Sequence, residues 1–254
     1  MTAKYGIVQV AHAPIRATDS DTAEIVTQLL FGEGLTILEQ KNQWLRIQCV
    51  HDKYEGWMDE KQIFACDEDS FHWWRKTSTR RIQEHMIAFN TNQGPYHLYR
   101  GSLVPEDFFN GFELAGIRFN AMQKDLPLQR KQSVIEFAQM YLNTPYLWGG
   151  RSATGIDCSG FTQIVFSFVG IDLPRDASQQ ENQGKKVEFN EIQAGDLAFF
   201  SNASGKVIHV GILTGQGTIL HAHGKVIEDE IKSDGIYKKQ SGQKSHNLLT
   251  IKRI

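Results

Sequence analysis

The pattern of apolar and polar positions changes about half-way along the chain. Residues 4–65 consist of short β-like runs separated by turn signals, and Trp44–Val50 (WLRIQCV) shows a period of two. Alternating runs of this length, joined by turns such as Gly32–Gly34, are typical of a small all-β barrel. We therefore predict a barrel over residues 1–65.

From residue 128 the spacing of apolar residues becomes helical. Leu128–Leu142 (LQRKQSVIEFAQMYL) predicts an amphipathic helix. Cys158–Val169 is apolar all round and predicts a buried helix that ends near Gly170. Short β-branched runs then follow at Asp196–Phe200, Val207–Thr214, Thr218–Ala222 and Leu248–Ile254. Helices followed by strands predict an α+β domain, here over residues 128–254.

Residues 66–127 have no dominant period. They are rich in aromatic residues and mix β-like with turn-like pieces. This composition fits a connector and a second, degenerate SH3-like barrel equally well.

Composition excludes several classes of partner. The 254 residues have 22% charged side chains and a formal net charge of −2, so charge gives no argument for nucleic acid or an anionic membrane as a partner. No signal-like N-terminus and no apolar window of about 18 residues occurs, so we expect a cytoplasmic protein, with export left open if a leader was removed. Three cysteines without a close pair argue against a disulfide framework. The oligomeric state is not predicted.

The position of Cys158 distinguishes it from the other two cysteines. A free cysteine is most often a small buried hydrophobe, and we assign Cys49 and Cys66 to that class. Cys158 instead stands where a helix is expected to begin. Unpaired backbone amides and the helix dipole stabilise an anion there and lower a thiol pKa, which predicts a thiolate nucleophile.

A nucleophilic thiol needs a base and a group that orients the base. The run Val207–Thr214 carries His209, the next run carries His221 and His223, and Gly215–Gly217 between them predicts a hairpin turn. A three-residue loop over Thr214–Gln216 would set His209 directly opposite His221, with β-carbons about 5 Å apart.

A zinc site is the main alternative chemistry. Asp157, Cys158, His209 and His221 are possible ligands, but they lack the close paired spacing of zinc motifs. We predict neither a metal nor a cofactor.

Two sets of motifs carry a resemblance to known families. Residues 128–254 resemble the NlpC/P60 family of papain-like cysteine peptidases, and residues 1–65 resemble bacterial SH3 domains. The first set is Pro145–Gly150 (PYLWGG), Asp157–Phe161 (DCSGF), Leu173–Asp176 (LPRD), Ala194–Leu197 (AGDL), His209–Ile212 (HVGI) and His221–Ala222; the second is Arg16, Phe31–Gly34, Trp44–Ile47 and Gly56–Met58. The resemblance implies a papain-like α+β domain preceded by an SH3-like barrel.

The resemblance also implies a catalytic set. Cys158 would be the nucleophile, His209 the general base and His221 the residue that orients His209. The Cys158 amide and the Tyr146 hydroxyl would bind the oxyanion, although Tyr146 also fits as an ordinary half-buried aromatic residue.

Further residues are candidates for substrate binding. The family lines its cleft with the residues that flank the nucleophile, here Asp157 and Ser159, and Asp157 also fits as a helix cap. Asp176 would pair either with a substrate amino group or with Arg175. Arg175 and Trp148 complete this group.

The two-domain arrangement looks like that of γ-D-glutamyl-L-diamino acid endopeptidases, which recycle cell-wall peptides. The expected partner is a murein-derived peptide with a free N-terminal L-Ala. The resemblance implies that the barrel offers an acidic residue to this amino group. The candidate residues around Gly56–Met58 are Tyr54, Glu55, Asp59 and Glu60, with Glu55 and its neighbour Tyr54 preferred as the amine-binding site.

Two other functions compete with peptide hydrolysis. One is a non-catalytic cell-wall-binding SH3 protein, and the other is an amidase or acyltransferase on the same fold. A cysteine that precedes the histidines in the chain favours the peptidase.

Overall fold

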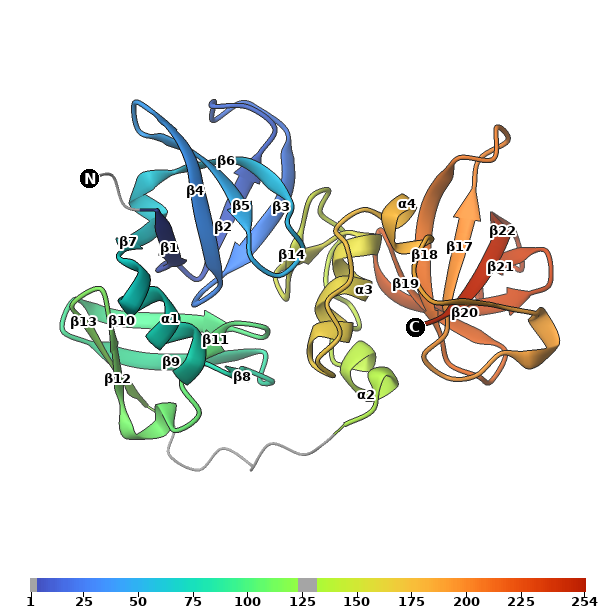
Figure 1. Cartoon of the computed structure of the whole chain (residues 1–254). Helices are drawn as coiled ribbons and strands as arrows, with labels where there is room; N and C mark the ends of the chain where they lie inside the picture. Colours follow the sequence, from blue (N-terminus) through green and yellow to red (C-terminus); the bar gives the residue numbers. More distant parts are fainter. Residues whose placement is uncertain (1–3, 123–131) are drawn as a thin grey trace. The chain divides into compact units, whose positions relative to one another are not determined.

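The computed structural model describes residues 4–122 and 132–254. The chain divides into two compact units, Met1–Lys131 and Gln132–Ile254 (Figure 1). The division falls within four residues of the boundary expected at residue 128.

The first unit begins with the predicted all-β barrel. Its seven antiparallel strands lie in the order β3-β2-β6-β5-β4-β1-β7. They are β1 (Tyr5–Val8), β2 (His12–Arg16), β3 (Ile25–Leu30), β4 (Gly34–Lys41), β5 (Trp44–Cys49), β6 (Glu55–Asp59) and β7 (Ile63–Cys66), with a 3-10 turn at Glu60–Gln62. The alternating side chains of β5 bury Leu45, Ile47 and Cys49 in the barrel core. The SH3-like fold predicted for this region is confirmed.

Residues 67–121, for which the sequence left a connector and a second barrel open, form a helix and a second sheet. Helix α1 (Glu68–Thr77) is followed by a four-stranded sheet in the order β10-β9-β13-β12 and by the small ladder β11-β8. The strands are β8 (Arg80–Arg81), β9 (Met86–Thr91), β10 (Gly94–Tyr99), β11 (Leu103–Val104), β12 (Phe112–Leu114) and β13 (Ile117–Ala121), with a 3-10 turn at Phe108–Asn110. The rings of Trp74, Tyr96, Phe112 and Phe119 contact that of Phe31 in the barrel, and Trp74 donates a hydrogen bond to the Gly32 carbonyl oxygen (2.9 Å).

The second unit packs short helices against one antiparallel sheet, as the α+β prediction requires. Its sheet runs β16-β22-β17-β18-β19-β20-β21, and β21 also pairs with β22, which closes six of the strands into a barrel. The helices are α2 (Val134–Gln139), α3 (Cys158–Ser167) and α4 (Ala177–Gln180); the strands are β14 (Arg151–Ser152), β15 (Gly155–Ile156), β16 (Lys185–Val187), β17 (Leu197–Ser201), β18 (Val207–Leu213), β19 (Thr218–His223), β20 (Lys225–Lys232), β21 (Gly235–Tyr237) and β22 (Lys244–Arg253), with a 3-10 turn at Phe189–Glu191.

The first helix of this unit is shorter than predicted. Of the expected span 128–142, residues 128–131 lie outside the described residues, and α2 begins only at Val134. Ser133 and Glu136 form a capping box: the Ser133 N–H donates to Glu136 Oε2 (2.7 Å), and Glu136 N–H donates to Ser133 Oγ (3.3 Å). These reciprocal bonds satisfy the first backbone donors and fix the start of the helix.

Three strands of the sheet were not predicted. β16, β20 and β21 are short or rich in charged residues, so their sequences lack the β-branched runs that mark the others. β20 matters most for the site, because it pairs with β19 along six residues and carries a buried aspartate.

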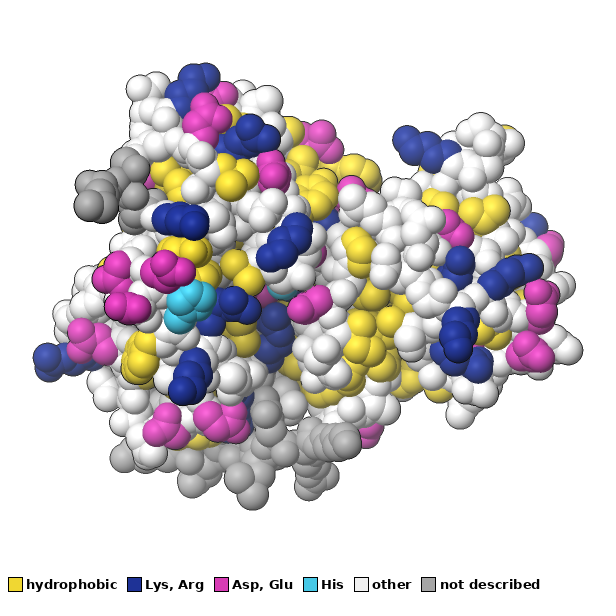
Figure 2. Space-filling model, in the orientation of Figure 1, with side chains coloured by type: hydrophobic (Ala, Val, Ile, Leu, Met, Phe, Trp, Pro, Cys, Tyr) yellow, Lys and Arg dark blue, Asp and Glu magenta, His cyan; other side chains and the backbone are white. Residues whose placement is uncertain are grey.

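Charges of both signs are interspersed over the face of the molecule drawn in Figure 2. None of the helices in the described ranges is long and apolar enough to span a membrane.

Candidate active site

Helix α3 places Cys158 at its first position, as the sequence predicts. Asp157 is the N-cap and accepts a hydrogen bond from the Gly160 N–H (2.7 Å). Such caps stabilise a helix by about 1 kcal/mol. As the first helical residue, Cys158 has an N–H group without an acceptor inside the helix. Its side chain is 7% exposed.

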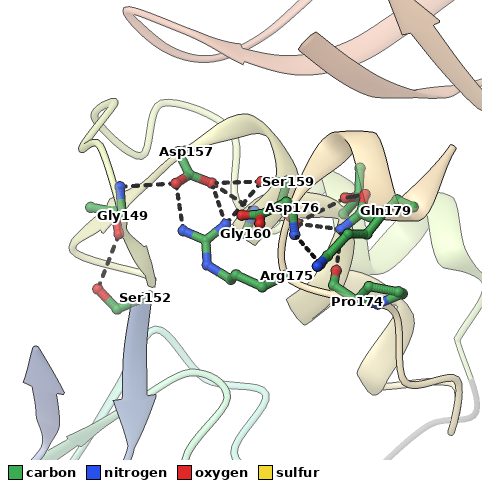
Figure 3. Close-up of polar contacts among 12 residues, drawn as sticks. Gly149, Ser152, Asp157, Ser159, Gly160, Pro174, Arg175, Asp176 and Gln179 are labelled. Carbon is green, nitrogen blue, oxygen red and sulfur yellow. Dashed lines mark hydrogen bonds and ion pairs between the residues drawn. The ribbon is translucent and has the colours of Figure 1, made fainter. Parts of the chain in front are cut away.

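Asp157 is also one half of a buried ion pair (Figure 3). Arg175 Nη1 contacts Asp157 Oδ1 at 3.0 Å, and Nη2 contacts Oδ2 at 2.5 Å. Arg175 Nη1 also donates to Ser159 Oγ (2.9 Å), and all three side chains are at most 7% exposed. The predicted substrate-binding residues Asp157, Ser159 and Arg175 are thus bonded to one another and hold the start of α3.

A glycine-rich loop completes this support. The Gly149 N–H donates to Asp157 Oδ2 (2.9 Å), so the loop is tied to the helix cap. A β-carbon at Gly160 would collide with the Gly150 carbonyl oxygen, which shows why the first turn of α3 needs glycine to accept this loop. The spacing of Pro145–Gly150 and Asp157–Phe161 in the sequence therefore reflects direct contact.

The thiol does not have the lowered pKa that we predicted. Burial, followed by the negative charge of Asp157, raises the pKa of Cys158 to about 12. Hydrogen bonds from the Val210 and Ser159 backbone and the Arg175 charge act in the opposite direction but are outweighed. The prediction considered only the helix start and missed the desolvation. A raised pKa favours the thiol form of Cys158, so an attack by its sulfur needs a base that accepts the proton.

The two histidines share a face of the hairpin, but in a different register from the predicted one. Gly211 lies opposite His221 and Leu213 opposite Ile219, so His209 is diagonal to His221 rather than directly across. The Thr214 N–H still donates to the Thr218 carbonyl oxygen (3.0 Å), so the loop has the predicted odd length of three but is Gly215–Gly217 and not Thr214–Gln216. Both glycines have positive φ (78° and 76°), a conformation that suits a turn and not the strand position predicted for Gly217.

The diagonal arrangement still brings the imidazoles together. His209 Nε2 and His221 Nδ1 are 2.8 Å apart, and both residues are buried. Gly211 makes this possible, because a β-carbon there would lie 2.9 Å from the His221 β-carbon. With Nε2 engaged, Nδ1 is the nitrogen of His209 that remains for a thiol proton.

The surroundings of His209 keep its imidazole neutral. Burial first, then the neighbouring His221, His246 and His223, lowers its pKa well below the ordinary value. The His246 ring stacks on His209 with centroids 4.3 Å apart and 19° between the planes. A neutral imidazole can accept a proton, as the proposed general base must.

Two residues of this cluster were missed by sequence reasoning. Asp229 Oδ2 lies 3.2 Å from His221 Nε2, and His246 covers His209. Asp229 is in β20, whose pairing with β19 was not predicted, and the apolar positions around it gave no signal that an aspartate faces inward. His246 was hidden because the last strand was expected to begin only at Leu248.

Three further predicted site residues, Tyr146, Trp148 and Asp176, also belong to the second unit. Tyr146 is 36% exposed; burial, then the Cys158 and Asp157 charges, raises its pKa to about 12, so the hydroxyl stays protonated. Trp148 is exposed, and Asp176 is the N-cap of α4.

Tyr54 and Glu55, the two barrel residues preferred for binding the substrate amino group, belong to the first unit. Tyr54 is partly buried against the barrel core, and Glu55 accepts a hydrogen bond from Arg46 (2.8 Å).

Metal ligation competes with a hydrogen bond that already exists. His209, His221 and His246 bring ligand atoms within 4.8 Å of one another. The nitrogens of His209 and His221 face each other across 2.8 Å, however, and the rings of His209 and His246 lie nearly parallel, so their in-plane lone pairs do not converge. In the alternative zinc set considered from the sequence, Asp157 is instead ion-paired with Arg175.

Comparison with known proteins agrees with this arrangement. A sequence model of the NlpC/P60 family matches residues 143–245, and one of the bacterial dipeptidyl-peptidase Sh3 domain matches residues 15–63. A Bacillus cereus protein named Gamma-D-glutamyl-L-lysine dipeptidyl-peptidase is 31% identical, with 78% of this chain and 67% of the relative aligned. The chain belongs to the NlpC/P60 family. A Bacillus subtilis protein of the same name is 29% identical over 85% of this chain and 79% of its own length.

Solved structures of the NlpC/P60 family share the fold. A crystal structure of an NlpC/P60 family protein from Bacillus cereus covers 98% of this chain and 99% of its own, with a TM-score of 0.78 at 20% identity. The predicted class is confirmed: this NlpC/P60 protein is a peptidase, and a cysteine nucleophile is typical of its family.

Proposed function

We propose that this peptidase hydrolyses the bond between γ-D-Glu and an L-diamino acid, Lys or meso-diaminopimelate, in cell-wall peptides with a free N-terminal L-Ala. The names of the two Bacillus relatives support the γ-D-glutamyl-L-lysine bond. The observation that carries the chemistry is the buried His209–His221 pair on the strands that pack against α3, which begins with Cys158. A role in murein peptide recycling is part of this proposal.

In the proposed reaction, His209 Nδ1 takes the thiol proton while Cys158 Sγ attacks the carbonyl carbon. Collapse of the tetrahedral intermediate breaks the C–N bond, and His209 returns the proton to the departing amine. Water then adds to the thioester with His209 as base, which releases the new carboxylate and restores the thiol. His221 holds His209 in the orientation that these transfers need.

Two groups are proposed to stabilise the oxyanion of the intermediate. The N–H of Cys158 has no acceptor inside the helix, and the Tyr146 hydroxyl stays protonated and can donate. Removal of the Tyr146 hydroxyl by Tyr146→Phe should lower kcat by roughly 10²- to 10³-fold, the range for loss of one oxyanion donor.

Substrate recognition is proposed to involve Trp148 and Asp176 beside the buried Asp157–Arg175–Ser159 network. The exposed Trp148 ring offers an apolar surface to the peptide. For Tyr54 and Glu55 a role in binding the substrate amino group stays a prediction.

Mass spectrometry of the products tests this proposal. Wild-type protein and Cys158→Ala are incubated with L-Ala-γ-D-Glu-L-Lys, its diaminopimelate analogue, and both peptides with an acetylated N-terminus. We expect L-Ala-D-Glu and the free diamino acid from unblocked peptides with wild type only. Equal cleavage of blocked peptides would overturn the requirement for a free L-Ala, and no cleavage of any peptide by wild type would favour a wall-binding protein.

A further inference from the structure

A carboxylate lies directly behind the second histidine of the proposed catalytic pair. Asp229, on β20, is diagonal to His221 on β19, since Ile227 is the residue opposite His221. Its Oδ2 is 3.2 Å from His221 Nε2. Asp229 is 5% exposed and His221 is fully buried, so solvent does not weaken this contact.

The other oxygen of Asp229 is also occupied. Oδ1 accepts a hydrogen bond from the Lys239 backbone N–H (2.9 Å). Burial raises the pKa of Asp229, but hydrogen bonds from His221 and the Lys239 backbone outweigh it, and the pKa remains below the ordinary value. Asp229 is therefore ionised near neutral pH, and an ionised carboxylate can only accept hydrogen bonds.

We propose that Asp229 is a positioning residue that sets the tautomers of both His221 and His209. Because Asp229 only accepts, His221 carries its hydrogen on Nε2, and its Nδ1 presents a lone pair. His209 Nε2, 2.8 Å away, must then donate its hydrogen to that lone pair. His209 Nδ1 is left unprotonated, which is the state that can take a proton from Cys158.

The same chain of contacts acts during turnover. When His209 Nδ1 receives the thiol proton, the ring becomes an imidazolium and keeps its Nε2–H bond to His221. The negative charge of Asp229, one imidazole further away, favours this cation without accepting its proton. Asp229 does not touch the substrate or Cys158 and acts only through His221. The inference rests on the proposed roles of Cys158 and His209.

Asparagine at position 229 separates this role from simple packing. An asparagine amide has one acceptor, its carbonyl oxygen, and one donor, its NH2 group. The carbonyl oxygen would accept the hydrogen bond of the Lys239 N–H. The NH2 group then faces His221 Nε2, which becomes the acceptor and moves the hydrogen to Nδ1. His209 Nε2 must in turn accept, so its Nδ1 carries a hydrogen and can no longer act as a base.

The experiment compares Asp229→Asn with Asp229→Ala and with Glu228→Gln as a matched control. Glu228 is the neighbouring acid, and its two carboxylate oxygens accept hydrogen bonds from Lys239 Nζ (3.0 Å) and Thr218 Oγ1 (2.6 Å). On L-Ala-γ-D-Glu-L-Lys we expect kcat to fall roughly 10²-fold or more for Asp229→Asn, less for Asp229→Ala, and not for Glu228→Gln, with KM nearly constant. A purely packing role predicts that Ala is the more damaging change, and that result would overturn the proposal.

A second readout needs no substrate. Long-range ¹⁵N–¹H correlation spectra of histidine-labelled protein near pH 7 should show Nε2–H tautomers for His209 and His221 in wild type and Nδ1–H tautomers in Asp229→Asn. A wild-type Nδ1–H tautomer at His221 contradicts the assignment even if the variants fail to fold. If wild type cleaves no peptide but shows the expected tautomers, the proposed substrate is wrong while the role of Asp229 in setting them stands.

Discussion

Replacement of Arg175 by methionine removes the guanidinium that neutralises Asp157, the residue before the thiol. Methionine keeps an unbranched apolar stem of similar length, so the main loss is the charge and its hydrogen bonds. Asp157 would stay buried as an anion with the Gly149 and Gly160 N–H groups as its remaining backbone donors (2.9 and 2.7 Å).

The expected cost follows from this geometry. Removal of one partner of a buried ion pair costs about 3–5 kcal/mol, because the other charge is left uncompensated. The two backbone donors retain part of the stabilisation, so we expect about 3 kcal/mol for Arg175→Met. The exposed pair of Arg118 and Glu113, whose side chains are 76% and 55% exposed, gives a matched control. Arg118→Met should change the free energy of unfolding by no more than about 0.5 kcal/mol.

Hydrogen exchange measured by mass spectrometry reports the local opening free energy at each pair, on peptides from residues 155–170 for Arg175→Met and from residues 112–121 for Arg118→Met. The double variant Asp157→Asn/Arg175→Met should recover part of the loss, because it leaves no unpaired charge. If Arg175→Met and Arg118→Met have equal effects, or if the double variant only adds the two single losses, the buried pair does not hold the start of α3.

Three further predictions concern the glycines and histidines of the second unit. Gly211→Ala pushes a β-carbon towards the His221 β-carbon, so kcat should fall at least 10-fold while far-ultraviolet circular dichroism stays unchanged; full activity would show that the imidazole pair tolerates displacement. Gly160→Ala should lower the melting temperature more than Gly170→Ala, which costs only left-handed backbone strain of about 1 kcal/mol because no atom lies within 4 Å of the new β-carbon; equal shifts would contradict the close approach of the loop. Burial, then His221 and His223, lowers the pKa of His246 from 6.5 to about 4, so the unfolded chain binds the proton first and stability should fall as pH drops from about 6.5 to about 4. If the melting temperature of His246→Phe depends on pH over this interval as steeply as that of wild type, His246 is not the source of the effect.

Much of the fold could be predicted because its signals are local. The alternation in β5 and the all-apolar run of α3 each follow from side chains a few residues apart. Cys158 at a helix start and His209 and His221 on one face of a hairpin could likewise be predicted from the sequence. The pairing register of β18 and β19 could not be predicted in the same way, because it depends on which residues of the turn adopt positive φ.

The features that could not be predicted depend on contacts between segments that are far apart in the sequence. Asp229 belongs to a strand without apolar alternation, and only its pairing with β19 turns the aspartate inwards. The raised pKa of Cys158 is a consequence of burial by the whole unit, which a helix-start argument does not contain. Arg175 was assigned to substrate binding because nothing in the sequence reveals that it reaches Asp157, eighteen residues earlier.

The central claim is that Cys158 forms the covalent bond to the γ-glutamyl carbonyl. Acid-quenched intact-mass spectrometry during turnover of L-Ala-γ-D-Glu-L-Lys tests it most directly, with peptide mapping to locate the adduct. The account predicts a transient thioester of L-Ala-γ-D-Glu on Cys158 in wild type and no adduct in Cys158→Ala. Turnover by Cys158→Ala, or an adduct on another residue, would contradict it.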